Sequence, residues 1–96
     1  MARLQVEVRP GTGVGGYSLF VDGVPVTMGA AHRGEAMCEG RCGDGSSHAL
    51  LFSLGGRPGA ELGIVLRCRG RVVCRVASAR IPEGEARAVG RILFDL

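Results

Sequence analysis

The sequence predicts an all-β protein, a small antiparallel β-sandwich of seven to eight strands. Apolar and polar residues alternate along several short segments, which is the pattern of a strand with one buried face. Turn-forming pairs such as Asp22-Gly23 separate these segments at short, regular intervals. The chain also contains 17 glycines among its 96 residues, and so many glycines suit tight turns far better than helices.

The length and composition of the chain narrow the expected architecture. Domains of about 100 residues hold a single core, so residues 1–96 are expected to form one domain. Only 4% of the residues are aromatic and none is Trp, so aliphatic side chains must fill that core. The number and spacing of the strands favour an immunoglobulin-like or jelly-roll-like sandwich over a helical fold.

The first half of the chain contains three expected strands. The segment Leu4–Arg9 alternates between apolar and polar residues. A hairpin follows, because Asp22-Gly23 lies between the apolar segments Tyr17–Val21 and Val24–Met28. Pro25 has no amide hydrogen to donate, so the second arm of this hairpin is expected at the edge of a sheet.

A long glycine-rich loop is expected over residues 29–48, with a short helical turn possible at Gly34–Cys38. Loops of this length in small domains are often functional. The remaining expected strands are Ala49–Leu54, Leu62–Arg69, Val72–Ala79 and Ala86–Leu96.

The hairpin around Gly70 allows a prediction of register. Its apolar residues can all face the core only if paired residue numbers add up to an even value. A three-residue loop satisfies this condition. It places Cys68 opposite Cys74 and Arg67 opposite Arg75.

Two histidines and two cysteines are the most suggestive candidates for a metal site. His32, Cys38, Cys42 and His48 all fall within or beside the expected loop. Imidazole and thiolate are the ligands that zinc prefers, and a three-residue gap between cysteines is compatible with its coordination. A zinc-stabilised domain is therefore one alternative. The other is a loop with two thiols and two solvated histidines and no cofactor.

The four cysteines also allow disulfides. Cys38 could bridge to Cys42, and Cys68 could bridge to Cys74. In a reducing cytosol we expect Cys68 and Cys74 to remain free thiols that pack as small apolar side chains. For Cys38 and Cys42 both alternatives stay open.

Arginines on the same hairpin form a candidate anion-binding set. Arg67, Arg69, Arg71 and Arg75 lie on or near its outward face, and guanidinium groups bind phosphate and carboxylate well. The alternative is that they only keep the sheet soluble and its edges unpaired. The net charge of +3 is too small for a dedicated nucleic-acid binder, so nucleic acid or another polyanion is not the favoured partner.

The sequence contains no convincing catalytic constellation, so we expect a non-enzymatic binding or assembly module. Its partner would be another protein or a second copy of the chain, in a homo-oligomer. The segment MARLQVEV lacks the apolar stretch of a signal peptide, and no apolar run has the length of a membrane span. We therefore expect a cytoplasmic protein that does not contact a membrane.

Overall fold

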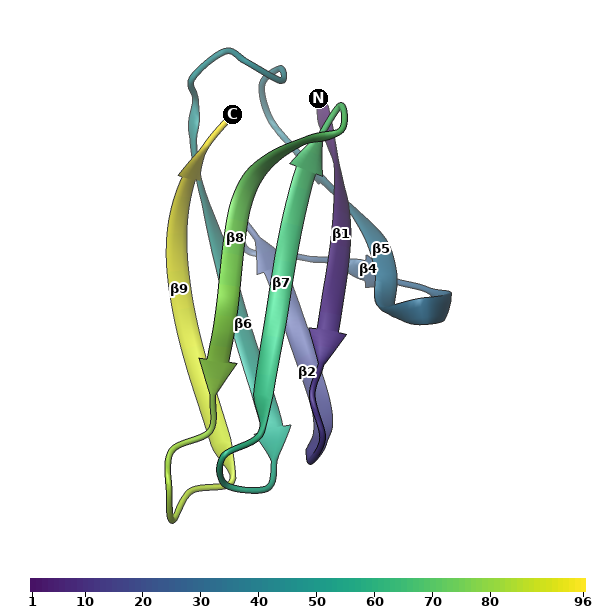
Figure 1. Ribbon diagram of the computed structural model, residues 1–96. Coiled ribbons are helices and arrows are strands. Elements are labelled where there is room, and N and C mark those ends of the chain that lie inside the picture. The colour runs from purple at the N-terminus through teal and green to yellow at the C-terminus, as the bar shows by residue number, and fades with distance from the viewer.

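Strand β1 (Ala2–Pro10) lies at the centre of one of the two sheets in the computed structural model, which describes residues 1–96 (Figure 1). Leu4, Val6 and Val8 of this strand are buried, as their alternation predicts. Strand β1 pairs antiparallel with β5 (Arg33–Cys38) on one side and with β7 (Glu61–Cys68) on the other.

Two antiparallel sheets pack face to face and enclose a core of 22 buried residues. Sheet A has the strand order β4 (Thr27–Met28), β5, β1, β7 and β8 (Arg71–Arg80). Sheet B has the order β3 (Val24–Pro25), β2 (Val14–Val21), β6 (Ser47–Gly56) and β9 (Arg87–Asp95). The predicted all-β sandwich is confirmed.

The hairpin predicted at Asp22-Gly23 is present, but its second arm is shorter than expected. Both turn residues have positive φ, 50° for Asp22 and 81° for Gly23, as a tight two-residue hairpin turn requires. Only Val24–Pro25 continues the pairing with β2. The chain then crosses to sheet A, where Thr27–Met28 pairs with β5, so one predicted strand becomes two very short ones.

The long loop predicted over residues 29–48 is wrong in its central part. Strand β5 occupies Arg33–Cys38, where a helical turn was considered possible, and it buries Ala36 and Cys38. Gly34 lets β4 approach closely, because a Cβ there would collide with the carbonyl oxygen of Thr27. The only helical segment is the three-residue η1 (Ala30–His32), and no helix is long and apolar enough to cross a membrane.

The hairpin of β7 and β8 corrects the predicted register. Its turn has two residues, Arg69 and Gly70, both with positive φ. This turn alone would give odd sums of paired numbers. An irregularity between Leu66 and Arg67 makes the sum even from Leu66 to Ile64, and a second irregularity makes it odd again at Leu62. Cys74 therefore lies opposite Leu66, not opposite Cys68.

Arg75 in turn lies opposite Val65, so the predicted pair of arginines is absent.

Candidate functional site

The outer face of sheet B exposes several large apolar side chains. Four large side chains on this face are exposed, namely Phe20 by 36%, Leu51 by 40%, Val89 by 73% and Leu93 by 66%. They come from the three neighbouring strands β2, β6 and β9, and Phe20 lies directly opposite Leu51. We call these four side chains the apolar face. Contiguous apolar surfaces of this kind mark interaction sites more often than single exposed residues do.

The outer face of sheet A has the opposite chemistry. The outward side chains of its strands are mainly charged or polar, and they include Arg3, Gln5, Glu7, Arg9, Arg33, Glu35, Arg67 and Arg75. Glu7 accepts hydrogen bonds from Arg67 at 3.2 Å and from Arg9 at 3.3 Å. The hydrogen bond from the Arg67 guanidinium is the largest contribution to the lowered pKa of Glu7. Sheet A is thus a solvated face, and the two outer surfaces of one small sandwich are not equivalent.

A shallow pocket runs across the apolar face between β2 and β9. Its lining is Phe20, Leu51, Phe52, Ser53, Val89, Gly90 and Arg91. Gly90 lies opposite Phe52, and a Cβ at position 90 would collide with the ring of this buried phenylalanine on the core side of the sheet. Arg91 is the only charged residue in the lining, and it takes part in none of the ion pairs.

The signal for this face is present in the sequence. The alternation that places Ile92 and Phe94 inward also places Val89 and Leu93 outward, beside Arg91. An analysis that considers only the inward residues of this strand does not detect Val89 and Leu93. An outward strand face with two large aliphatic side chains is the pattern that identifies the site.

A disulfide closes the end of the sandwich that contains the β5–β6 loop, which we call the tip. Cys42 in this loop is bonded to Cys68 at the end of β7, whereas Cys38 and Cys74 are buried free thiols. Neither of the two disulfide pairs considered from the sequence forms. The expectation that Cys68 and Cys74 both stay free thiols is wrong for Cys68 and is confirmed for Cys74. Disulfides persist mainly in oxidising compartments, so this bond does not favour the expected cytoplasmic location, which stays a prediction.

A chain of hydrogen bonds holds the same loop from its other side. His48 is buried. Its Nδ1 atom is hydrogen-bonded to Asp22 Oδ2 at 2.6 Å, and its Nε2 atom is hydrogen-bonded to the Ser46 hydroxyl at 2.8 Å. Ser46 Oγ in turn donates to Asp44 Oδ1 at 2.6 Å. These bonds satisfy an otherwise costly buried imidazole, and they fix the β5–β6 loop to the β2–β3 turn.

This chain has the connectivity of a Ser-His-Asp triad but not its proton arrangement. In a triad the serine hydroxyl gives its proton to the imidazole. Here the Ser46 hydroxyl donates to Asp44 instead. Burial, followed by the charges of Asp22 and Asp44, raises the pKa of the Cys38 thiol, and burial raises the pKa of the Cys74 thiol. Both shifts lower the fraction of the reactive thiolate form.

The structure separates the four residues predicted as zinc ligands. His32 Nδ1 is hydrogen-bonded to the Tyr17 hydroxyl at 2.7 Å, on the β4–β5 connection. Cys42 is in the disulfide, Cys38 is a free thiol, and His48 contacts Asp22. No group of three or more potential ligands is placed to hold a metal ion.

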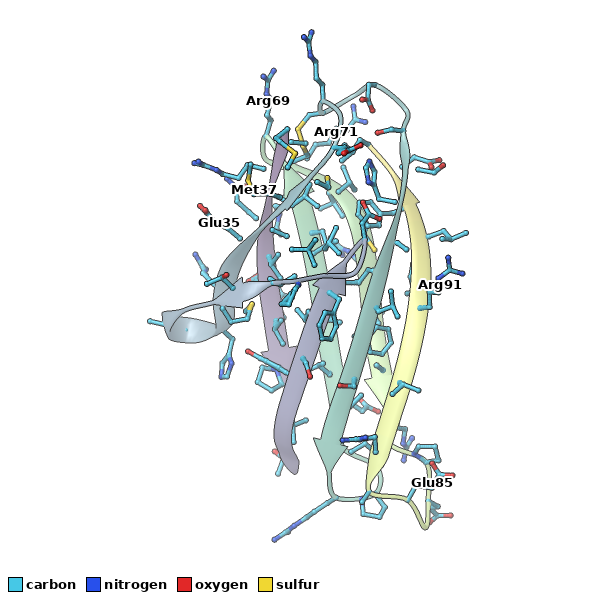
Figure 2. The ribbon with its side chains drawn as sticks, turned by 180° about the vertical axis from the view of Figure 1, so that it is seen from behind. Glu35, Met37, Arg69, Arg71, Glu85 and Arg91 are labelled. Atoms are coloured by element: carbon cyan, nitrogen blue, oxygen red, sulfur yellow. A yellow bond between two sulfur atoms is a disulfide. The ribbon has the colours of Figure 1, made fainter.

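The four predicted anion-binding arginines are also divided. Arg67 pairs with Glu7, and Arg75 lies on the outer face of sheet A. Arg69 and Arg71 lie at the tip (Figure 2), where both line a pocket beside the disulfide. Arg3 and Arg41 line the adjoining pocket together with Arg69, so the tip gathers a different set of four arginines from the predicted one.

In comparisons with known proteins, the chain matches no family model, no curated protein and no solved structure.

Reduction of the Cys42–Cys68 disulfide should destabilise the protein. The bond closes a segment with a sequence separation of 26, and loop-closure entropy for such a segment is worth about 3.5 kcal/mol. Urea unfolding with and without a phosphine reductant measures the effect. Cys42→Ala should be insensitive to the reductant, and unfolded, unreduced wild type should expose two thiols, Cys38 and Cys74. Equal unfolding midpoints with and without reductant would contradict this role.

Acid should weaken the anchoring of the β5–β6 loop. The Ser46 hydroxyl, followed by the backbone N–H groups of Arg41 and Ser46, lowers the pKa of Asp44 from its usual 3.8 to about 2. A lowered folded-state pKa stabilises the protein above pH 3.8, and this contribution disappears as the pH falls through 2. The difference in urea midpoint between wild type and Asp44→Asn should therefore be largest near neutral pH and should disappear in acid.

Ser46→Ala provides the matched control for this titration. It removes the main cause of the shift, so the acid loss should move to higher pH. A difference between wild type and Asp44→Asn that does not change with pH would rule out this assignment.

Proposed function

We propose that the protein is a non-enzymatic binding module whose working surface is the apolar face of sheet B. The observation that carries the proposal is the contrast between the two outer surfaces. Sheet A presents charged side chains that pair with one another. Sheet B exposes Phe20, Leu51, Val89 and Leu93, at an unfavourable hydration free energy that a partner would relieve.

The chemistry of this face indicates the kind of partner. Phe20, Leu51 and Val89 line the same pocket as Arg91, which makes no ion pair within the chain. A protein surface that is apolar and places one carboxylate opposite Arg91 would complement it, because a guanidinium that becomes desolvated needs a charged hydrogen-bond partner. We therefore favour a protein partner with an acidic residue at the centre of an apolar patch.

A photo-crosslinking amino acid at Leu51 tests the proposal in cells of the source organism. Met37 provides the control, because it is exposed by 41% on sheet A, against 40% for Leu51 on sheet B. We expect a discrete protein adduct from position 51 and none from position 37. The adduct should disappear with Arg91→Glu and persist with Arg75→Glu.

Equal crosslinking from both positions, crosslinking only to lipid, or an adduct unaffected by Arg91→Glu would overturn the proposal.

A second candidate function is the binding of a polyanion at the tip. Arg3, Arg41, Arg69 and Arg71 line two adjoining pockets there, and Arg41, Arg69 and Arg71 make no ion pair within the chain. Clustered unpaired guanidinium groups attract phosphate and sulfate groups, in a manner that salt weakens.

Heparin chromatography tests this candidate. The double variant Arg69→Gln/Arg71→Gln should elute at clearly lower salt than wild type, because it loses two cations from the tip. The matched control is Arg57→Gln/Arg80→Gln, which removes the same charge from the opposite end and should shift elution much less. Equal shifts for the two variants would show that net charge alone determines retention and would exclude a site at the tip.

A further inference from the structure

Strand β9 is the one sheet edge in this molecule that is both long and regularly paired. Strands β3 and β4 have two residues each, and β3 contains Pro25. Strand β8 is irregular at two places in its pairing with β7. These are the usual ways in which proteins block an edge. Strand β9 is nine residues long, contains no proline and pairs with β6 in one uninterrupted register.

The most exposed side chains of the apolar face lie on this open edge. Val89 and Leu93 are exposed by 73% and 66%, compared with 36% for Phe20 and 40% for Leu51 on the inner strands. The difference arises because β9 has a neighbouring strand on one side only. A further strand added beside β9 would cover both of them.

The outward residues of β9 are complementary to a second, antiparallel copy of the same strand. In order they are Arg87, Val89, Arg91, Leu93 and Asp95. A cation and an anion are at the two ends, and two aliphatic residues flank the central Arg91. If Arg91 meets its own mate on a two-fold axis, Arg87 faces the second copy's Asp95 and Val89 faces its Leu93. Opposite charges and paired aliphatic side chains directly across a strand pair are both stabilising.

Other registers lose this match. A shift of one residue would place outward residues of one copy beside inward residues of the other. A shift of two in either direction would place a charged residue opposite Val89 and Leu93. The centred register has one unfavourable contact, Arg91 against its mate, and this contact predicts that Arg91→Thr pairs more tightly than wild type.

We infer that the protein forms a symmetric dimer in which the β9 strands of two copies pair antiparallel about Arg91. Sheet B then becomes one continuous eight-stranded sheet. In Figure 2 the Arg91 side chain extends from β9 into solvent, on the side away from β6. The inference goes beyond the proposed function, because the second copy pairs with the edge of β9, while Phe20 and Leu51 lie on the inner strands β2 and β6.

A single cysteine at the axis gives a register-specific test with the full chain. In the inferred dimer, residue 91 lies opposite its own mate, within the Cα separation of about 4.4–6.8 Å that a disulfide spans. Arg91→Cys should therefore form a covalent dimer with oxidised glutathione. Leu93→Cys is the control, because the two residues 93 lie about 13 Å apart along the strands, and it should stay monomeric on a non-reducing gel.

A charge exchange tests the pairing without a crosslink. Light scattering of wild type should give twice the chain mass of 10.0 kDa. Arg87→Asp alone places two carboxylates opposite each other at both ends of the pair and should give monomers, as should Asp95→Arg alone. The double variant Arg87→Asp/Asp95→Arg restores opposite charges and should restore the dimer. Arg75→Asp on β8 should not affect it.

A monomeric wild type at every concentration overturns the inference, as does a dimer that neither single exchange disrupts. Crosslinking from Leu93→Cys and not from Arg91→Cys would overturn the register. Failure of the dimer is distinguishable from failure of the proposed function. Leu51 lies on β6, one strand in from the open edge. If the chain is monomeric and position 51 still gives an Arg91-dependent adduct with another protein, the dimer alone is overturned.

Discussion

The packing of sheet A on sheet B through an aliphatic core is the interaction on which the other features depend. The largest side chains with almost no exposure are Leu4, Val21, Leu50, Leu54, Leu62, Ile64, Leu66 and Ile81. Each contributes roughly 1.5–3 kcal/mol by its burial. Successive side chains of a strand point to opposite faces of the sheet, so the side chains next to the core-facing ones lie on the outer face. The two sheets differ in the chemistry of these outer side chains, which are mainly charged or polar on sheet A and include four exposed large apolar side chains on sheet B.

A core this small benefits from additional constraints, and the tip has two. The Cys42–Cys68 disulfide holds the β5–β6 loop to sheet A, and the hydrogen bonds from His48 to Asp22 and Ser46 hold it to sheet B. The loop thereby connects the two sheets at the end where the arginines gather. The same constraints explain why the four residues predicted as zinc ligands do not gather into one site. The disulfide takes up Cys42, and hydrogen bonds to Asp22 and Ser46 take up His48.

Alternation and turn chemistry predicted most of the strands and the sandwich, and the failures have physical causes. Strand β5 was missed because its inward residues, Ala36 and Cys38, are small and give a weak apolar period. The hairpin register was wrong because a bulge after Leu66, not a longer turn, restores the parity. The pairing of Cys42 with Cys68 joins segments far apart in the chain, and local patterns contain no information on such contacts. The apolar face was predictable in part, because Val89 and Leu93 follow from the same alternation as their buried neighbours.

The open edge and the apolar face are best understood together. A long and regularly paired edge strand promotes aggregation unless a specific partner covers it, and the charges at Arg87 and Asp95 favour one antiparallel register over its neighbours. Two copies joined in this register would present two apolar faces on the same side of one sheet. A small face gives modest affinity alone, but two linked copies bind a two-fold or repeated partner with a much higher effective concentration. Pairing along β9 would therefore protect the edge and also increase the affinity of a surface that is small in the single chain.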